Sequence, residues 1–299
     1  MAGLQLTVTL KRLFPAPTSD TTAWRIYHDA AAGVWVDHFD GHWLVQTQAP
    51  TFPDFLRSVG EGVAKSIYWR PRDKAAATAP AHVAGEMVTE RFVVKENGAS
   101  FLIDFSAGYS SGIFLDQRLN RRCVGETVRP GERILNTFAY TGGFSVMAAL
   151  AGAETTTTDL SKSYLNWTWD NFTLNGLDPA AHHGVKGDVF EWLATFARQG
   201  RTFHGIVLDP PTFSRNGRVT FRTDRDYSDL AALAVVLVEP GGWMLCCANT
   251  HGLTPVQFER DVIQGIKSRR RGVVSNESPS MPPEFGGDDY LKSLRLVVE

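Results

Sequence analysis

The sequence has 299 residues, of which 43% are hydrophobic, and its formal net charge at neutral pH is −2. This length suits one large domain with a smaller one, and the hydrophobic content excludes a mainly disordered chain. The near-neutral charge excludes a strongly basic protein, so any contact with a nucleic acid has to come from a local cluster of arginines.

The cysteines indicate an intracellular chain. Cys123, Cys246 and Cys247 are odd in number, and the last two are adjacent in an apolar run. This pattern predicts neither a disulfide framework nor a metal site, and a reducing cytoplasm suits it best. The first 14 residues do not have the pattern of a signal peptide, and the longest apolar run, 230–238, is too short to span a membrane.

The first part of the chain, 1–84, is predicted to be a small α+β domain that contacts substrate. Residues 23–48 contain two alternating apolar runs separated by small residues and by Gly41, which indicates a short antiparallel sheet. Residues 53–70 are typical of a helix followed by a strand. Residues 70–86 are rich in Ala and Pro, and we interpret them as a linker to the second domain.

The second part, 85–299, is predicted to be an α/β domain. It opens with a hairpin whose turn is Asn97-Gly98. Strands are then expected at 133–138, 154–159, 182–188, 203–211 and 243–250, alternating with helices at 144–152, 163–176, 189–200, 227–242 and 255–270, before closing strands at 272–277 and 291–299. The alternation predicts a Rossmann-like, mostly parallel sheet with helices on both faces. Such sheets bind ligands outside the carboxyl ends of their strands.

A glycine turn follows the first strand of this series. Asn136 precedes the run Tyr140-Thr141-Gly142-Gly143. The two glycines permit a tight turn and a close approach of the backbone to a ligand before a helix begins. The GxGxxG fingerprint of dinucleotide-binding proteins is absent, which disfavours a nicotinamide cofactor. A purely structural turn is the alternative.

Acids follow the next three strands. Asp159 ends the second strand, where a carboxylate can accept two hydrogen bonds from ribose hydroxyls. Asp188 follows the third strand and can accept a hydrogen bond from an exocyclic amine, with Val189 as an apolar wall. Either acid could instead cap the helix that follows it. Asp209 and two prolines end the fourth strand. Taken together, this order predicts a site for an adenosine with a polar tail, with chemistry at the fourth strand.

These segments resemble the class I S-adenosylmethionine-dependent methyltransferases. More narrowly, they are similar to the bacterial family that modifies bases of 23S ribosomal RNA, in its cytosine-C5 and guanine-N7 branch. The resemblance covers about residues 90–270 strongly and implies a seven-stranded methyltransferase sheet. The motifs that carry it are at 112–122, 135–146, 155–167, 187–193, 207–214, 225–230 and 240–253.

The resemblance implies a role for each strand end. The turn at 138–143 would wrap the methionine end of S-adenosylmethionine. Asp159 would bind the ribose hydroxyls, Asp188 would hold the adenine, and Asp209 would stand beside the transferable methyl group. The implied cofactor contacts are Gln117, Arg118, Asn136, Phe138, Ala139, Tyr140, Thr141, Gly142, Gly143, Asp159, Leu160, Ser161, Asp188, Val189 and Asp209.

Two departures from the family pattern affect the expected chemistry. Many members carry an extra N-terminal RNA-binding domain, which this chain is expected to lack. Members that methylate carbon 5 of cytosine carry a cysteine after the fifth strand, where this sequence has Asn249. Carbon 5 needs a thiolate to add to the ring first, whereas a ring nitrogen needs only in-line placement. We therefore expect methylation of a guanine ring nitrogen. Cytosine methylation with Cys247 as nucleophile is the alternative.

Gln117 and Arg118 are expected to close over the cofactor carboxylate, although this segment could equally be a solvated helix face. Asp209, Pro210 and Phe213 are the expected catalytic residues, because the prolines stiffen the turn and the aromatic ring can stack on an extruded base. Arg215, Arg218, Arg222 and Arg225 follow, and RNA phosphates could bind there. An ordinary solvated surface is the alternative for these arginines.

The expected function is methyl transfer from S-adenosylmethionine to a base of RNA, with ribosomal RNA as the partner. Two further hypotheses stay open at this point. One is a small-molecule methyltransferase on the same fold, and the other is a cofactor-binding RNA scaffold without turnover. The sequence predicts no membrane partner and does not indicate the oligomeric state.

Overall fold

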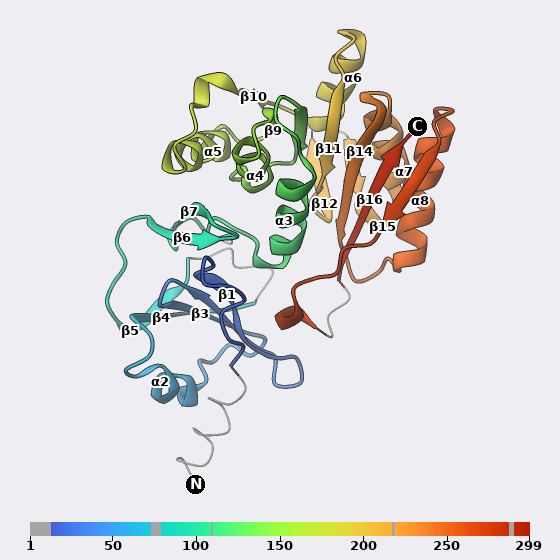
Figure 1. Cartoon of the computed structure of the whole chain (residues 1–299). Helices are drawn as coiled ribbons and strands as arrows, with labels where there is room; N and C mark the ends of the chain where they lie inside the picture. The colour runs from blue at the N-terminus through green and yellow to red at the C-terminus, as the bar shows by residue number, and fades with distance from the viewer. Residues whose placement is uncertain (1–12, 73–78, 109, 217–218, 287–289) are drawn as a thin grey trace. The chain divides into compact units, whose positions relative to one another are not determined.

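The computed structural model describes residues 13–72, 79–108, 110–216, 219–286 and 290–299. The chain divides into two compact units (Figure 1). The first contains Met1–Arg118 together with Pro282–Phe285, and the second contains Leu119–Met281 together with Gly286–Glu299. Residues 85–118, which we expected in the larger domain, therefore belong to the first unit.

The first unit is built on a five-stranded sheet. Its strands are β1 (Ala23–Asp29), β2 (Val34–Phe39), β3 (His42–Thr47), β4 (Ser66–Pro71) and β5 (Ala81–Gly85), in that order, with α2 (Asp54–Gly60) between β3 and β4. The first three strands are antiparallel neighbours and a helix and strand follow them, as predicted. Of the expected linker at 70–86, residues 70–71 belong to β4 and 81–85 to β5, which pairs with β4, and residues 73–78 lie outside the described residues.

The Asn97-Gly98 hairpin is confirmed. It joins β6 (Phe92–Glu96) to β7 (Ala99–Ile103), and both turn residues have positive φ, 51° and 79°. Two-residue hairpin turns need this conformation, which Asn and Gly adopt at low cost. A distant segment, η3 (Pro283–Phe285), also belongs to the first unit. There the Arg25 guanidinium lies 4.1 Å from the centre of the Phe285 ring.

The second unit contains a seven-stranded sheet in the order β10-β9-β8-β11-β14-β16-β15 (Figure 1). The first five strands of this order are parallel, and β16 and β15 are antiparallel to their neighbours. This confirms the predicted mostly parallel α/β sheet. The strands are β8 (Arg133–Thr137), β9 (Glu154–Asp159), β10 (His183–Lys186), β11 (Phe203–Leu208), β14 (Val238–Asn249), β15 (Val273–Glu277) and β16 (Leu291–Val298).

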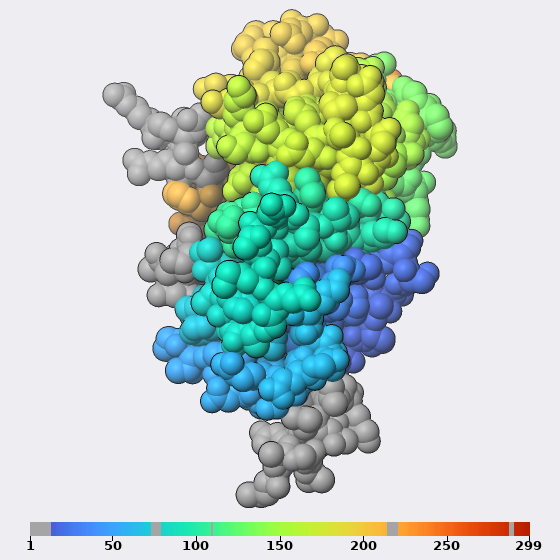
Figure 2. All heavy atoms as spheres, turned by 90° about the vertical axis from the view of Figure 1, so that its left-hand side faces the viewer, coloured from blue at the N-terminus to red at the C-terminus, as the bar shows by residue number. Residues whose placement is uncertain are grey.

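Helices cover both faces of this sheet. On one face, α6 (Val189–Arg198), α7 (Thr223–Val235) and α8 (Pro255–Ser268) bury their apolar sides in one core cluster. On the other face, α3 (Arg118–Thr127) and α4 (Gly143–Leu150) pack into a second cluster. The remaining helix, α5 (Lys162–Leu174), contacts β9 and β10, and its yellow-green atoms lie at the surface in Figure 2. No helix among the described residues is long and apolar enough to cross a membrane.

The region after β11 differs from the expectation. Residues expected as a loop form a hairpin, β12 (Phe213–Asn216) with β13 (Val219–Arg222), and α7 begins at Thr223 rather than at 227. In addition, β14 begins at Val238, inside the expected helix. The segment Glu239-Pro240-Gly241-Gly242 lies within β14 and does not interrupt it. The pairing of β11 with β14 shifts register between Phe203 and Gly205, and this irregularity accommodates the segment.

One sheet glycine gives a test of the packing. A Cβ atom on Gly205 of β11 would lie 2.2 Å from the Trp243 ring of β14. We expect Gly205→Ala to lower the free energy of unfolding by about 1–3 kcal/mol, because neither neighbouring strand can move aside. Urea denaturation measures this. Gly252→Ala is the matched control, because a Cβ atom there meets no atom within 4 Å. Equal stability of the two variants would contradict the packing account.

Candidate functional site

The predicted site residues of the second unit lie at one edge of its sheet. The strands β10, β9, β8 and β11 are adjacent and parallel, so the segments that follow them emerge side by side. These segments are the glycine turn at 138–143 and the ones that contain Asp159, Asp188 and Asp209. The structure thus brings together four segments that are up to 70 residues apart in the sequence.

The glycine turn has an unusual backbone. Phe138, Tyr140 and Gly142 all have positive φ, at 52°, 51° and 78°. For a bulky residue this conformation costs on the order of 1–3 kcal/mol and persists only where surrounding contacts hold it. The Ala139 N–H donates to the Thr158 carbonyl at 3.0 Å, and the Gly142 N–H donates to the Ala139 carbonyl at 2.8 Å. Strain held in this way is typical of ligand-binding turns.

Helix α5 fixes the turn from the other side. A Cβ atom on Gly142 would lie 2.3 Å from Cγ2 of Thr168, so glycine is required there by contact as well as by φ. The Asn171 amide donates to the Thr141 carbonyl at 2.9 Å. Since α5 follows Asp159 directly, the second strand end and the glycine turn are held as one assembly.

Asp159 connects these parts. Its two carboxylate oxygens accept hydrogen bonds from the backbone N–H groups of Tyr140 and Ser161, each at 2.8 Å. Burial raises the pKa of this carboxyl group, and the two N–H donors partly offset the rise. Helix α5 is capped by Ser161, whose hydroxyl accepts from the Tyr164 N–H at 3.3 Å. The alternative that Asp159 caps the helix is therefore wrong.

Asp188 has the helix-capping role that was the alternative for it. One carboxylate oxygen accepts from the N–H groups of Phe190 at 2.8 Å and Glu191 at 3.2 Å, at the start of α6. Val189 is buried in the core below, whereas Leu160 is 47% exposed. The adenine-binding role of Asp188 stays a prediction.

Asn136 brings a buried polar group to the same edge. Its side chain is 1% exposed, and its amide donates to the Ser145 hydroxyl at 2.9 Å, which in turn is 2.8 Å from the Thr157 hydroxyl. The carbonyl oxygen of the Asn136 amide has no hydrogen-bond partner within the described ranges. Such an orphaned acceptor is costly unless a donor occupies it. It suits a cofactor that has hydroxyl and ammonium donors.

The fourth strand end is a rigid turn with an exposed ring. Asp209 is half-buried and Pro210 is buried, whereas the Phe213 ring is 57% exposed at the start of the β12–β13 hairpin. Side-chain hydroxyls of α7 donate to the backbone carbonyls of this turn: Tyr227 to Leu208 at 2.9 Å and Thr223 to Pro211 at 3.0 Å. The catalytic roles expected for this turn stay predictions.

The two adjacent cysteines face opposite sides of the sheet. Cys246 lies in the core with α6–α8 and Cys247 in the core with α3 and α4, and both are completely buried. Burial raises the pKa of Cys246 to about 12. The Asn120 amide of α3 lies 3.6 Å from the Cys247 sulfur. This is the arrangement of small buried hydrophobes.

Gln117 and Arg118 belong to the first unit, whereas the other predicted cofactor residues belong to the second. Both are buried, so the solvated-face alternative is wrong. The Arg118 guanidinium forms a buried two-point ion pair with Glu284 of η3, through Nη1 to Oε1 and through Nη2 to Oε2 at 3.1 Å. This pair explains why residues 282–285 belong to that unit. A cofactor role for Gln117 and Arg118 stays a prediction.

The arginines after Asp209 do not form a concentrated positive patch where they are described. Arg222 pairs with Asp224 at 2.8 Å and Arg225 pairs with Asp226 at 2.6 Å, and both arginines are exposed. Arg218 lies outside the described residues, as does the side chain of Arg215. Surface ion pairs of this kind cancel much of the field that would attract a phosphate.

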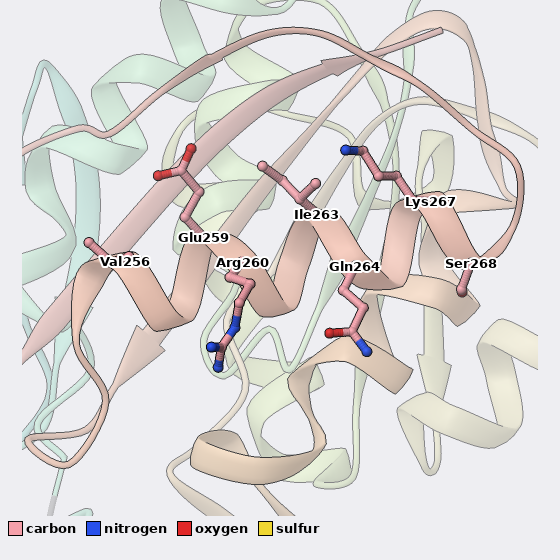
Figure 3. Close-up of a pocket in the computed structure, with 7 residues that line it drawn as sticks. All are labelled: Val256, Glu259, Arg260, Ile263, Gln264, Lys267 and Ser268. Carbon is pink, nitrogen blue, oxygen red and sulfur yellow. The ribbon is translucent and has the colours of Figure 1, made fainter.

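Sequence analysis missed the hydroxyl groups of Thr223 and Tyr227. A signal was present for Tyr227, since the segment 225–230 is one of the motifs of the resemblance, but no role was attached to that residue; Thr223 lies outside the motif. A separate hollow is lined by side chains of α8 alone (Figure 3). None of the predicted site residues contributes to it. The lining residues are Val256, Glu259, Arg260, Ile263, Gln264, Lys267 and Ser268.

Comparison with known proteins agrees with this geometry. Residues 44–297 match the model of the S-adenosylmethionine-dependent methyltransferase family. The chain is 32% identical to YwbD of Bacillus subtilis, over 92% of this chain and 72% of that one. It is 34% identical to ribosomal RNA large subunit methyltransferase K of Neisseria meningitidis, over 88% of this chain and 77% of the relative.

A solved structure shares the fold. SMU.776, crystallised with S-adenosylhomocysteine, superimposes with a TM-score of 0.84 at 26% identity, covering 99% of this chain and 79% of that one. S-adenosylhomocysteine is the product that S-adenosylmethionine leaves after it gives up its methyl group. The matching family model, the similarity to relatives over most of both chains and the strand-end site lead to one conclusion: the chain belongs to the S-adenosylmethionine-dependent methyltransferases.

Proposed function

We propose that this methyltransferase modifies a guanine ring nitrogen in large-subunit ribosomal RNA. The observation that carries the proposal is the exposed Phe213 ring, 57% accessible and four residues after Asp209. An aromatic side chain beside a strand-end acid suits a flat, extruded base, and stacking of this kind contributes about 1–3 kcal/mol. The name of the Neisseria meningitidis relative supports ribosomal RNA as the substrate.

The cofactor is assigned to the turn and the acids. The segment 138–143 would hold the methionine end, Asp159 the ribose hydroxyls and Asp188 the adenine. The two N–H groups that bind Asp159 keep its carboxylate oxygens fixed at the strand end. The buried acceptor oxygen of Asn136 would receive a donor of the cofactor. S-adenosylmethionine supplies a methyl group on a positively charged sulfur.

The reaction places few demands on this chain. When bound, S-adenosylmethionine would supply its methyl group to the lone pair of the base nitrogen, and S-adenosylhomocysteine would be the product. Nitrogen 7 of guanine carries no hydrogen, so no proton has to be removed. The chain's tasks are to hold the base in line with the methyl group and to exclude water. Phe213 and the stiff turn at Asp209 suit the first task.

The buried cysteines support nitrogen over carbon as the target. Methylation of carbon 5 of cytosine requires a thiolate that reaches the ring. Cys247 is completely buried on the face covered by α3 and α4, and Asn249 stands where the resemblance would place the nucleophile. All three cysteines are free thiols, which also supports the cytoplasm as the compartment.

A small-molecule substrate is the second candidate. The ion pairs of Arg222 with Asp224 and of Arg225 with Asp226 favour it, because they weaken the attraction for RNA phosphates. Under this alternative the cofactor residues and the acid turn keep their roles, and only the acceptor changes.

Asp159 gives the first test of the cofactor site. We expect Asp159→Ala to weaken S-adenosylmethionine binding by about 100-fold, because charge-assisted hydrogen bonds contribute about 1.5–3 kcal/mol each. Isothermal titration calorimetry measures this. Asp229→Ala, at an exposed position of α7, is the control and should bind normally. Unchanged affinity in Asp159→Ala would remove this residue from the site.

The cysteines give a test of the target atom. We expect Cys247→Ala to keep the methyl-transfer rate of the wild type within about twofold, because a buried thiol takes no part in attack by nitrogen. Cys246→Ala is the matched control, since it removes the same sulfur from the opposite core. Single-turnover assays with labelled cofactor compare them. A rate that collapses only in Cys247→Ala would establish carbon 5 chemistry.

The substrate is tested by mass spectrometry of nucleosides. We expect the ribosomal RNA of a strain that lacks this gene to lose one methylguanosine, which the wild-type gene restores. Loss of 5-methylcytidine instead would contradict the nitrogen assignment. An unchanged set of nucleosides would contradict the RNA proposal and favour the small-molecule candidate.

A further inference from the structure

The turn that carries Asp209 is poor in backbone hydrogen-bond donors. Pro210 and Pro211 have no N–H group, so between Leu208 and Phe213 only Asp209 and Thr212 carry one. A backbone segment in a binding site is normally held in place by the hydrogen bonds of a β-ladder or of a turn. With two N–H groups missing, the turn depends more on its carbonyl groups, which accept hydrogen bonds from side chains elsewhere in the fold.

Two side-chain hydroxyls of α7 supply donors to these carbonyl groups. The Tyr227 hydroxyl of α7 donates to the Leu208 carbonyl at 2.9 Å, and the Thr223 hydroxyl donates to the Pro211 carbonyl at 3.0 Å. The Thr223 N–H adds a hydrogen bond to the Thr212 carbonyl at 3.2 Å. The Thr212 hydroxyl then donates to the Asn249 carbonyl at the end of β14. The turn is therefore tied to α7 and to the next strand.

The donors are placed rigidly. Tyr227 is 1% exposed and Thr223 is completely buried, one turn apart on the same helix. Burial raises the pKa of Tyr227 well above its ordinary value, with Cys246, Cys247 and Asp209 adding to the rise. The hydroxyl therefore stays protonated and remains a donor at all physiological pH values.

We propose that Thr223 and Tyr227 are positioning residues for methyl transfer, acting through the Asp209-Pro210-Pro211 turn. They hold the carbonyl groups at both ends of the turn and so fix where Asp209 and the Phe213 ring stand relative to the cofactor. The inference rests on the proposed function in that it takes this turn as the acceptor side of the site. It predicts a loss of rate without a loss of cofactor affinity.

Three variants test this in the full chain. Tyr227→Phe and Thr223→Val each remove one hydroxyl with little change of shape, and Thr223→Ser restores it. A misplacement of about 1 Å can cost on the order of 100-fold in rate. We expect both hydroxyl-free variants to lower the single-turnover rate about tenfold or more, with Thr223→Ser close to the wild type. All should bind S-adenosylmethionine within about twofold of the wild type by calorimetry.

Two further variants calibrate the experiment. Asp209→Ala removes the side chain that the anchors position, so it sets the lower limit of the rate. Tyr68→Phe removes a buried tyrosine hydroxyl that contacts backbone in the first unit and should leave the rate unchanged. Wild-type rates in both hydroxyl-free variants would overturn the inference. An equal loss of rate and cofactor affinity would also overturn it, because it would mark a general structural role.

Hydrogen exchange separates this inference from the proposed function. The acceptor is ribosomal RNA from the strain that lacks the gene, and failure of the wild type to methylate it would contradict the proposed function alone. In that case the anchor inference is tested by the hydrogen-exchange rates of backbone amides in peptides spanning 209–223, measured with the cofactor bound. We expect faster exchange in Thr223→Val than in Thr223→Ser. Equal exchange in the two variants would overturn the anchor.

Discussion

Parallel pairing of β9, β8 and β11 is the constraint on which the site depends. Parallel neighbours end at the same edge, so the segments after them meet in space whatever their separation in the chain. The registers match residue to residue, with Asn136 of β8 between Thr157 of β9 and Val207 of β11. The acids and the glycine turn therefore have their positions set by the backbone before any side chain contributes.

The half-buried carboxylate of Asp159 shows how this constraint becomes a binding site. A carboxylate at a strand end is costly to bury, and two backbone N–H groups offset part of that cost. One of these donors, the N–H of Tyr140, belongs to the strained turn after the neighbouring strand. The same interaction thus stabilises the acid and fixes the turn. A single carboxylate links the two halves of the proposed cofactor site.

The turn at Asp209, on the proposed acceptor side of the site, is held in place in a different way. Two consecutive prolines give stiffness but remove the N–H donors that would normally fix a turn. Hydroxyl groups of α7 compensate, which links the turn to the apolar core that α7 shares with α6 and α8. In this fold a helix that packs as an ordinary core element also supplies contacts to the site. The exposed Phe213 ring follows directly after this anchored turn.

The sequence alone was sufficient for the main architecture. The alternation of strands and helices predicted the parallel sheet of the second unit, and Asn97-Gly98 predicted the separate hairpin of β6 and β7, because both signals are local in the chain. The position of Asp159 at a strand end was predictable for the same reason, since the run of β-branched threonines stops there. The family resemblance, carried by seven short motifs, added the identity of the cofactor.

Tertiary structure decided what local signals do not encode. Whether an acid after a strand caps a helix depends on which N–H groups surround it, and this separated Asp188, which caps α6, from Asp159, which does not. The burial of Cys247, the inclusion of residues 85–118 in the first unit and the pairing of Arg118 with Glu284 all depend on residues distant in sequence. Hydrogen bonds and burial between residues distant in sequence form only in the folded chain. The residue pattern therefore determined the helices and strands, and the tertiary packing determined which contacts each side chain makes.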